Sequence, residues 1–263
     1  MKRFELIGPS GVGKTTLYNS ICRTERNWRN YLTVKEAYVL AAGNAELPLT
    51  AVRLRLYRHL LKQNILNNRE LGLARHVLQL NRRKNKLVNR SDYERFSTSF
   101  KILYNDLGYE SNPIVVAANI NAFIKRIDEY LILNRLLTGD HRVLFDDGMI
   151  HLWGGLGNYD TSTISPEDIK NDVLFNPAGV ILCEHAPEVI YNQVMKRKNE
   201  GVFRFSLDHY SQGELISHIN ADVENLKIKA GFFKDHNIPV LTLDLSEDVA
   251  LIMQKINCFV AGV

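Results

Sequence analysis

The sequence predicts an α/β fold with a parallel sheet in three layers, and three observations support it. Short apolar segments of strand composition alternate with longer segments of helical periodicity, which is typical of a parallel sheet with helices on both faces. The first strand leads directly into a glycine-rich turn that opens a helix. The chain has 263 residues, which suits one α/β domain carrying an insertion.

Five strands are expected along the chain. They are residues 4–7, 31–34, 141–145, 180–183 and 239–243. The first helix is expected from about Gly13 to Ile21, and the second strand ends at Lys35 and Glu36. We find no internal repeat and no low-complexity linker, so residues 1–263 are treated as a single domain.

Residues 50–138 are predicted to form a mainly helical insertion, because apolar side chains recur there at three and four positions. One helix opens with the capping-box pattern of Ser91 and Glu94 and stops at Gly108. Another begins near Pro113 and runs to Gly139.

Composition and cysteine usage indicate a cytoplasmic protein. The chain is 45% hydrophobic and 24% charged, as an ordinary globular protein is. Cys22, Cys183 and Cys258 are odd in number and far apart, so neither a disulfide framework nor a metal site is expected. The start of the chain has no signal-peptide pattern, and no apolar run is long enough to span a bilayer.

Residues 8–15, GPSGVGKT, match the phosphate-binding pattern G-x-x-x-x-G-K-[ST] between a strand and a helix. In such a loop (a P-loop) the backbone N–H groups surround phosphate oxygens, and the helix N-terminus adds positive potential. We expect Lys14 to reach the β- and γ-phosphates of ATP and the Thr15 hydroxyl to bind Mg²⁺. The residues expected to bind the nucleotide are Gly8, Ser10, Gly11, Val12, Gly13, Lys14, Thr15 and Thr16.

Two carboxylates are candidates for catalysis beside this loop. Asp146 ends an apolar strand, where a carboxylate can hold Mg²⁺, although Asp-Asp-Gly is also turn chemistry. Glu36, at the end of the second strand, is either a base near the γ-phosphate or a surface residue. Asp147 is an alternative base.

A basic lid is expected over residues 196–205, with Arg197 ahead of Arg204 as the cation that closes on the triphosphate. The alternative is a solvated helix end, where cations favour the helix dipole. His151 and Trp153 follow the Asp146 strand and border the expected cleft, either as acceptor contacts or as packing.

The loop GPSGVGKTT, the strand ending at Lys35-Glu36, VLFDDG and APEVIYNQVMKRKNEG together resemble the nucleoside-monophosphate and deoxynucleoside (thymidylate-like) kinase group over about half of the chain. The resemblance implies a P-loop NTPase fold, Glu36 as catalytic base, Asp146 as metal-side carboxylate and Arg197 as lid arginine. It also implies that residues 243–246 flank adenine. Ala37, Asp147 and Gln193 depart from the pattern of the group on the acceptor side, which leaves the acceptor open.

Positive charge is concentrated between Ala51 and Phe100, with twelve Lys or Arg against three Asp or Glu. These residues form a face for an anionic partner or a set of solvated helices; nucleic acid is possible but not favoured, because aromatic residues other than Tyr57 are sparse among them. The basic residues in question are Arg53, Arg55, Arg58, Arg75, Arg82, Arg83, Lys84 and Lys86.

The sequence therefore predicts an ATP- and Mg²⁺-dependent phosphotransferase that acts on a small polar or anionic molecule with a hydroxyl or phosphate group. Lys14, Glu36, Asp146 and Arg197 are its expected catalytic residues. Two alternatives are a polynucleotide-end kinase or nucleic-acid-associated ATPase, and a slowly hydrolysing regulatory switch. The chain lacks a convincing N-K-x-D guanine signature, which favours ATP over GTP.

Overall fold

The computed structural model describes residues 1–24, 28–44, 88–107, 113–146, 148–152, 164–200 and 211–263. Its centre is a sheet of five parallel strands in the order β2-β3-β1-β4-β5. The strands are β1 Lys2–Ile7, β2 Leu32–Thr33, β3 Arg142–Phe145, β4 Gly179–Glu184 and β5 Val240–Asp244. The predicted α/β fold with a five-stranded parallel sheet is therefore confirmed.

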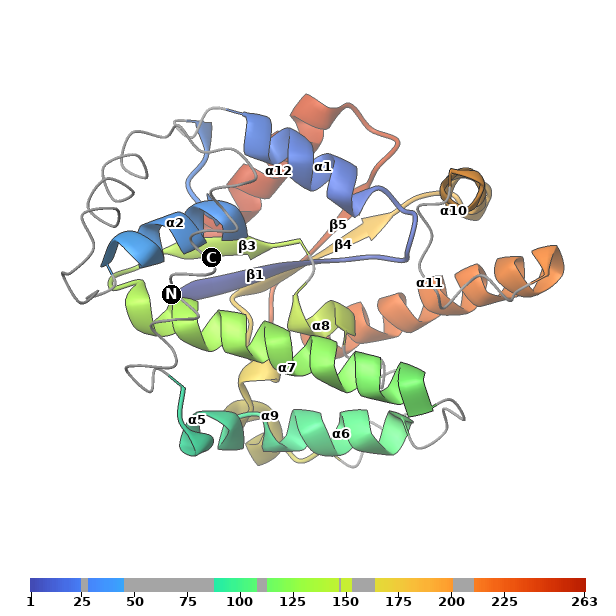
Figure 1. Cartoon of the computed structure of the whole chain (residues 1–263). Helices are drawn as coiled ribbons and strands as arrows, with labels where there is room; N and C mark the ends of the chain where they lie inside the picture. Colours follow the sequence, from blue (N-terminus) through green and yellow to red (C-terminus); the bar gives the residue numbers. More distant parts are fainter. Residues whose placement is uncertain (25–27, 45–87, 108–112, 147, 153–163, 201–210) are drawn as a thin grey trace.

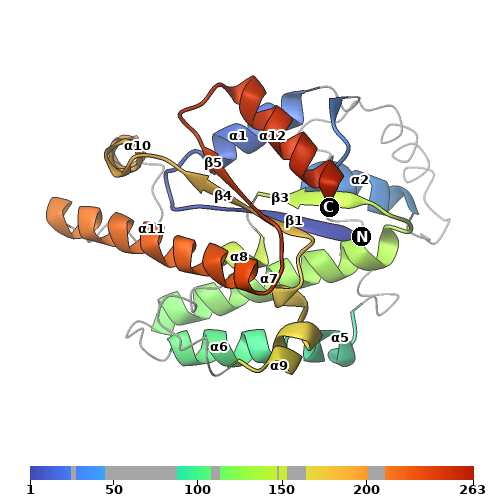
Figure 2. The same cartoon turned by 180° about the vertical axis from the view of Figure 1, so that it is seen from behind.

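Helices cover both faces of the sheet (Figure 1). One face carries α1 Lys14–Arg23 and α12 Val249–Gly262, and the other carries α7 Pro113–Leu136, α8 Met149–Leu152 and α11 Gln212–Asp235 (Figures 1 and 2). α5 Arg90–Glu94, α6 Ser97–Leu107 and α9 Pro166–Asn171 lie beyond α7, on the side away from the sheet. No helix in the described ranges is both long and apolar enough to cross a membrane.

Alternation along the strands divides the core into two clusters. In β1, the buried Phe4 and Leu6 pack with α1 and α12, whereas Ile7 faces the opposite layer. Leu144 and Ile181 likewise lie on the α1 side, while their neighbours along β3 and β4 point to the α7 side. This period of two explains why each short strand is apolar throughout: both of its faces are buried.

α7 is part of this core, although the sequence placed it in the insertion. Phe123, Ile127 and Leu133 are fully buried and belong to the cluster on the α7 side of the sheet. The C-terminal part of the segment 50–138 therefore forms a structural layer of the domain. Residues 45–87 and 108–112 of that segment lie outside the described residues.

The predicted helix from Ser91 to Gly108 is wrong in two details. Its cap is Asn89, which forms a capping box with Asp92, and the helix is interrupted between α5 and α6. Asn89 can take the place of Ser91 as the N-cap residue, because its side chain can also accept a hydrogen bond from a free helical N–H. α7 also ends at Leu136, short of Gly139, which takes a φ of 101°.

Candidate functional site

The glycine-rich loop between β1 and α1 has a backbone that requires its glycines. Gly11 and Gly13 have φ angles of 90° and 110°, in the left-handed region that other residues rarely adopt. A side chain on Gly8 would begin 2.7 Å from the carbonyl oxygen of Cys183 in β4. Val12, only 1% exposed, anchors the loop in the core on the α1 side.

The loop presents N–H groups at the start of α1. The first intrahelical hydrogen bond runs from the N–H of Leu17 to the carbonyl of Gly13, so the preceding amides have no acceptor within the helix. Thr15 and Thr16 are exposed in this first turn, which contains no acidic residue. Such a helix end favours an anion, and it is accessible to one.

Lys14 lies against the same loop. Its ammonium group donates hydrogen bonds to the carbonyl oxygens of Gly8 and, at 3.1 Å, Pro9. The charge of Lys14 is thus held at the start of the loop. The sequence-predicted residues 8–16 therefore form one loop and the first turn of α1, in which Thr15 and Thr16 are exposed and Val12 is buried.

Asp146 follows β3, the strand that pairs with β1 on the side away from β4. The carboxylate is half-buried, and its charge reaches α1: after burial, Asp146 is the largest cause that raises the pKa of Tyr18. Tyr18 lies one turn beyond Lys14 on α1. Asp146 and the start of α1 thus share the carboxyl edge of the sheet, as the sequence predicted, whereas Asp147 is outside the described residues.

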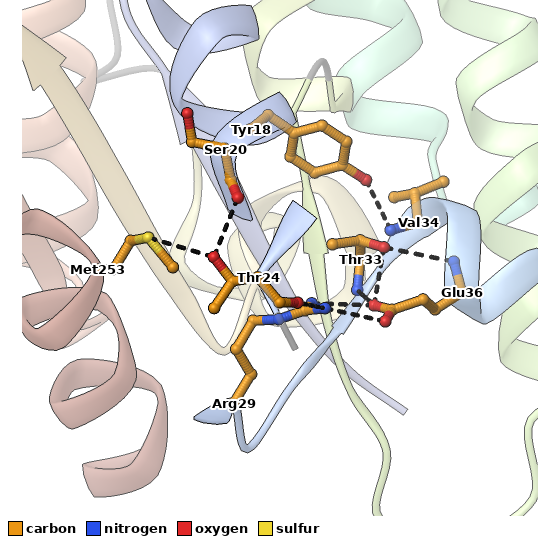
Figure 3. A network of polar contacts seen from close by, with 8 residues as sticks. All are labelled: Tyr18, Ser20, Thr24, Arg29, Thr33, Val34, Glu36 and Met253. Atoms are coloured by element: carbon orange, nitrogen blue, oxygen red, sulfur yellow. Dashed lines mark hydrogen bonds and ion pairs between the residues drawn. The ribbon is translucent and has the colours of Figure 1, made fainter. Parts of the chain in front are cut away.

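Glu36 is placed differently from its prediction. It does not end a strand: β2 stops at Thr33, and Glu36 stands in the first turn of α2 Val34–Asn44. Figure 3 shows its carboxylate receiving two hydrogen bonds from the guanidinium of Arg29, at 2.9 and 3.0 Å, and two from the amide and hydroxyl of Thr33, both at 2.8 Å. A carboxylate that already caps the turn before α2 has little freedom to act elsewhere.

The pKa of Glu36 also argues against a role as general base. Burial by itself would raise its pKa, but the hydrogen bonds from Arg29 and Thr33, together with the Arg29 charge, outweigh burial and lower the pKa below the ordinary value. A general base is most effective when its pKa lies close to the working pH. The geometry therefore favours a structural role for Glu36 in joining β2 to α2.

Helix α10 Pro187–Asn199 lies against the glycine-rich loop. The Cβ that alanine would add at Gly11 falls 2.7 Å from Cγ2 of Val194 and 3.1 Å from the carbonyl oxygen of Ile190. Arg197 follows these two residues by one and two turns on the same helical face, so it is carried on the loop side of α10. Gln193 shares that face, while Arg204 and the rest of the predicted lid from residue 201 lie outside the described residues.

A cavity of about 430 Å³ opens beside the loop, between α11 and the ends of β4 and β5. Pro9 of the loop, Glu184 and Asp244 contribute to its wall, and α11 contributes Asn220 and Lys227. Asp244 also accepts a hydrogen bond from the N–H of Ser246 at 2.8 Å, which shapes the turn after β5. The volume is within the range of small-molecule pockets.

Sequence reasoning missed one acidic residue of this region, Asp222 in α11. Its carboxylate lies 3.7 Å from the imidazole of His218, and the charge of Lys14 acts on it. The signal available in the sequence was the spacing of four between His218 and Asp222, which places them on one face of a helix. Nothing in the sequence linked that face to the glycine-rich loop.

Other predicted contacts are only partly described. His151 lies in α8, directly after Ile150, whose N–H is bound by Glu5 of β1. Trp153 and the basic residues of the segment 50–86 are outside the described residues, so their roles stay predictions. Cys183 is fully buried, and burial raises the pKa of its thiol to about 12, as expected of a packing residue rather than a nucleophile.

No family model matches this chain, and the search of curated proteins found no match.

Proposed function

We propose that this protein is a P-loop phosphotransferase that moves the γ-phosphoryl group of ATP to a small-molecule acceptor. The observation that carries the proposal is the loop of residues 8–15: its glycines in the left-handed region, the lysine held against it and the open first turn of α1 occur at the carboxyl edge of a parallel sheet. Ligands of open α/β sheets bind at that edge. The resemblance to the thymidylate-like kinase group also supports ATP as the phosphoryl donor bound by this loop.

In this proposal the loop amides and Lys14 bind the β- and γ-phosphates, and the helix N-terminus adds favourable potential. The nucleoside would extend toward the cavity lined by Pro9 and Asp244. Arg197, carried on the loop side of α10, would close on the triphosphate. Its charge would stabilise the transferring phosphoryl group.

The residues present suit Mg²⁺. An exposed hydroxyl at Thr15 and a half-buried carboxylate at Asp146 share one edge of the sheet, and Mg²⁺ is usually held by one or two such protein oxygens together with substrate phosphates. Bound there, the ion would neutralise negative charge on the phosphates. Thr15 and Asp146 would hold it.

The test is incubation with Mg²⁺–ATP and a panel of nucleosides, nucleotides and sugars, read as ADP release and product mass. Lys14→Ala should lower transfer at least about a hundredfold, because it removes the only side-chain cation built into the loop itself. Lys234→Ala, at an exposed position in the last turn of α11, is the control and should keep full activity. Full activity in Lys14→Ala would rule the mechanism out.

A further inference from the structure

Helix α11 presents two different polar flanks on either side of its buried stripe. At about 100° per residue, His218, Asp222 and the buried Lys229 fall within about 40° of one another around the helix. Asn220, Val223 and Lys227, which line the cavity, fall on the other flank. Between the two flanks runs the apolar stripe of Leu215, Ile219, Leu226, Ala230 and Phe233, buried in the core.

The order of the strands decides where each flank points. The cavity flank meets Glu184 and Asp244, at the ends of β4 and β5, and also Pro9 of the glycine-rich loop. Because β1 pairs with β4 on the side away from β5, the opposite flank of α11 points toward β1 and β3. Those are the strands that lead into the glycine-rich loop and into Asp146, and α8 lies on the same face of the sheet (Figures 1 and 2).

Asp222 is accessible on this flank and lies within electrostatic reach of an imidazole and two lysines. Its side chain is 39% exposed, and its carboxylate lies 3.7 Å from the imidazole of His218. Burial raises the pKa of Asp222, and the charges of His218, Lys229 and Lys14 oppose that rise without cancelling it. His218 and Lys229 belong to α11 itself, and Lys14 comes from the end of the loop that follows β1.

We propose that Asp222, paired with His218, takes the proton from the hydroxyl group to which the γ-phosphoryl is transferred. This inference rests on the proposed function. It follows from the placement of an accessible carboxylate within electrostatic reach of Lys14, on the flank of α11 that points toward β1 and β3. It also replaces Glu36, whose carboxylate is committed to Arg29 and Thr33.

The acceptor oxygen forms a bond to the γ-phosphorus while its O–H bond breaks and the proton moves to an oxygen of Asp222. The bond between the γ-phosphorus and the bridging oxygen breaks, and ADP leaves with that electron pair. The protonated Asp222 then returns its proton to solvent.

A base at this position defines the acceptor class. A terminal phosphate has a second pKa of about 6, so its oxygen is already ionised at neutral pH and needs no base. An alcohol keeps its proton until the new bond forms, and a positioned base contributes about 10²–10⁴-fold to such a reaction. The acceptor is therefore a hydroxyl compound, such as a nucleoside or sugar, rather than a nucleotide.

Asp222→Asn tests the inference, with Asp235→Asn, exposed at the end of the same helix, as the matched control. Transfer from Mg²⁺–ATP is measured to adenosine, thymidine, ribose and glucose as hydroxyl acceptors, and to AMP and dTMP as phosphate acceptors. The expected result is transfer to a hydroxyl acceptor and a kcat lowered about 10²–10⁴-fold in Asp222→Asn alone. Asp222→Glu, which keeps the carboxylate, should recover part of the rate.

A second readout separates proton transfer from folding or binding. Wild-type activity should fall as the pH drops through the raised pKa of Asp222, and Asp222→Asn should lose this acid limb. The affinity of Asp222→Asn for a non-hydrolysable ATP analogue in the presence of Mg²⁺ should differ from that of the wild-type protein by less than about twofold. If no panel member is phosphorylated, hydrolysis of ATP, with water as acceptor, is compared in the same variants.

The outcomes are distinguishable. Transfer to AMP or dTMP alone, or an Asp222→Asn variant with wild-type kcat and an intact acid limb, would overturn the role of Asp222 and leave the phosphotransferase proposal standing. Failure of the wild-type protein to bind the Mg²⁺–ATP analogue would instead overturn the proposed function itself.

Discussion

The buried carboxylate of Glu5 accepts a hydrogen bond from the backbone N–H of Ile150 at 2.8 Å, although the two residues stand 145 positions apart. The other oxygen of Glu5 lies 3.1 Å from Nε of Arg3, and both side chains are almost fully buried. Arg3 in turn donates to the carbonyls of Val173 and Leu174. This pair thus ties β1 to α8, which begins three positions after Asp146.

Removing one partner of this pair should be costly. Arg3→Met leaves the Glu5 charge buried without its cation, and we expect the free energy of unfolding to fall by about 3–5 kcal/mol. Arg3→Met combined with Glu5→Leu removes both charges and should lose less than the sum of the single changes. Urea unfolding of the two single variants and the double variant measures this coupling; strictly additive losses would show that the two charges do not interact.

The ion pair of Glu36 predicts a stability that depends on pH. Because the folded-state pKa of Glu36 is lowered, its contribution is fully present above the ordinary glutamate pKa and is lost as the pH falls through the lowered value. Glu36→Gln should cost about 1–3 kcal/mol at neutral pH, since Arg29 is left buried, and this deficit should shrink in acid.

Urea unfolding at several pH values checks the Glu36 prediction. Glu94→Gln is the matched control, because the pair of Glu94 with Arg90 is exposed at 4.0 Å and should contribute less than about 0.5 kcal/mol. A Glu36 deficit that stays constant from neutral to acid pH would contradict the proposed ionised pair. A large loss of kcat at unchanged stability would restore Glu36 as the base.

Two buried tyrosines offer a matched comparison. The hydroxyl of Tyr18 accepts a hydrogen bond from the N–H of Val34 at 2.8 Å and so joins α1 to the start of α2 (Figure 3). Tyr18→Phe leaves that buried N–H without its acceptor and should cost about 1–3 kcal/mol. Tyr31, whose buried hydroxyl has no hydrogen-bond partner within the described part of the chain, should tolerate phenylalanine with little change. Equal effects in thermal unfolding would refute the distinction.

Alanine substitutions at Gly11 and Gly139 distinguish the cost of a left-handed backbone from the cost of steric contact with neighbouring atoms. Both have positive φ angles, 90° and 101°, but only an alanine at Gly11 would meet neighbours, the Val194 methyl and the Ile190 carbonyl of α10. Gly139→Ala should cost about 1 kcal/mol, from the left-handed backbone alone. Gly11→Ala should cost more and should weaken binding of a Mg²⁺–ATP analogue, because α10 must shift. An equal loss of stability with unchanged nucleotide affinity would show that α10 does not constrain the loop.

Local patterns were enough to predict the sheet and the loop. Each strand is apolar because both of its faces are buried, and the glycines of residues 8–15 report a backbone that only glycine adopts readily. Asp146 could be placed because it directly follows β3, and parallel strands end at one edge. These predictions depend only on residues that are close in the sequence.

The sequence by itself thus determined the fold class, the glycine-rich loop and the edge of the sheet where a site would lie. Only the tertiary structure decided the partners: Arg29 and Thr33 commit Glu36 to capping α2, Glu5 reaches Ile150, and Asp222 of α11 comes within electrostatic reach of Lys14. The physical reason is distance along the chain. Periodicity and loop chemistry are local properties, whereas the state of a carboxylate depends on which charges folding brings beside it.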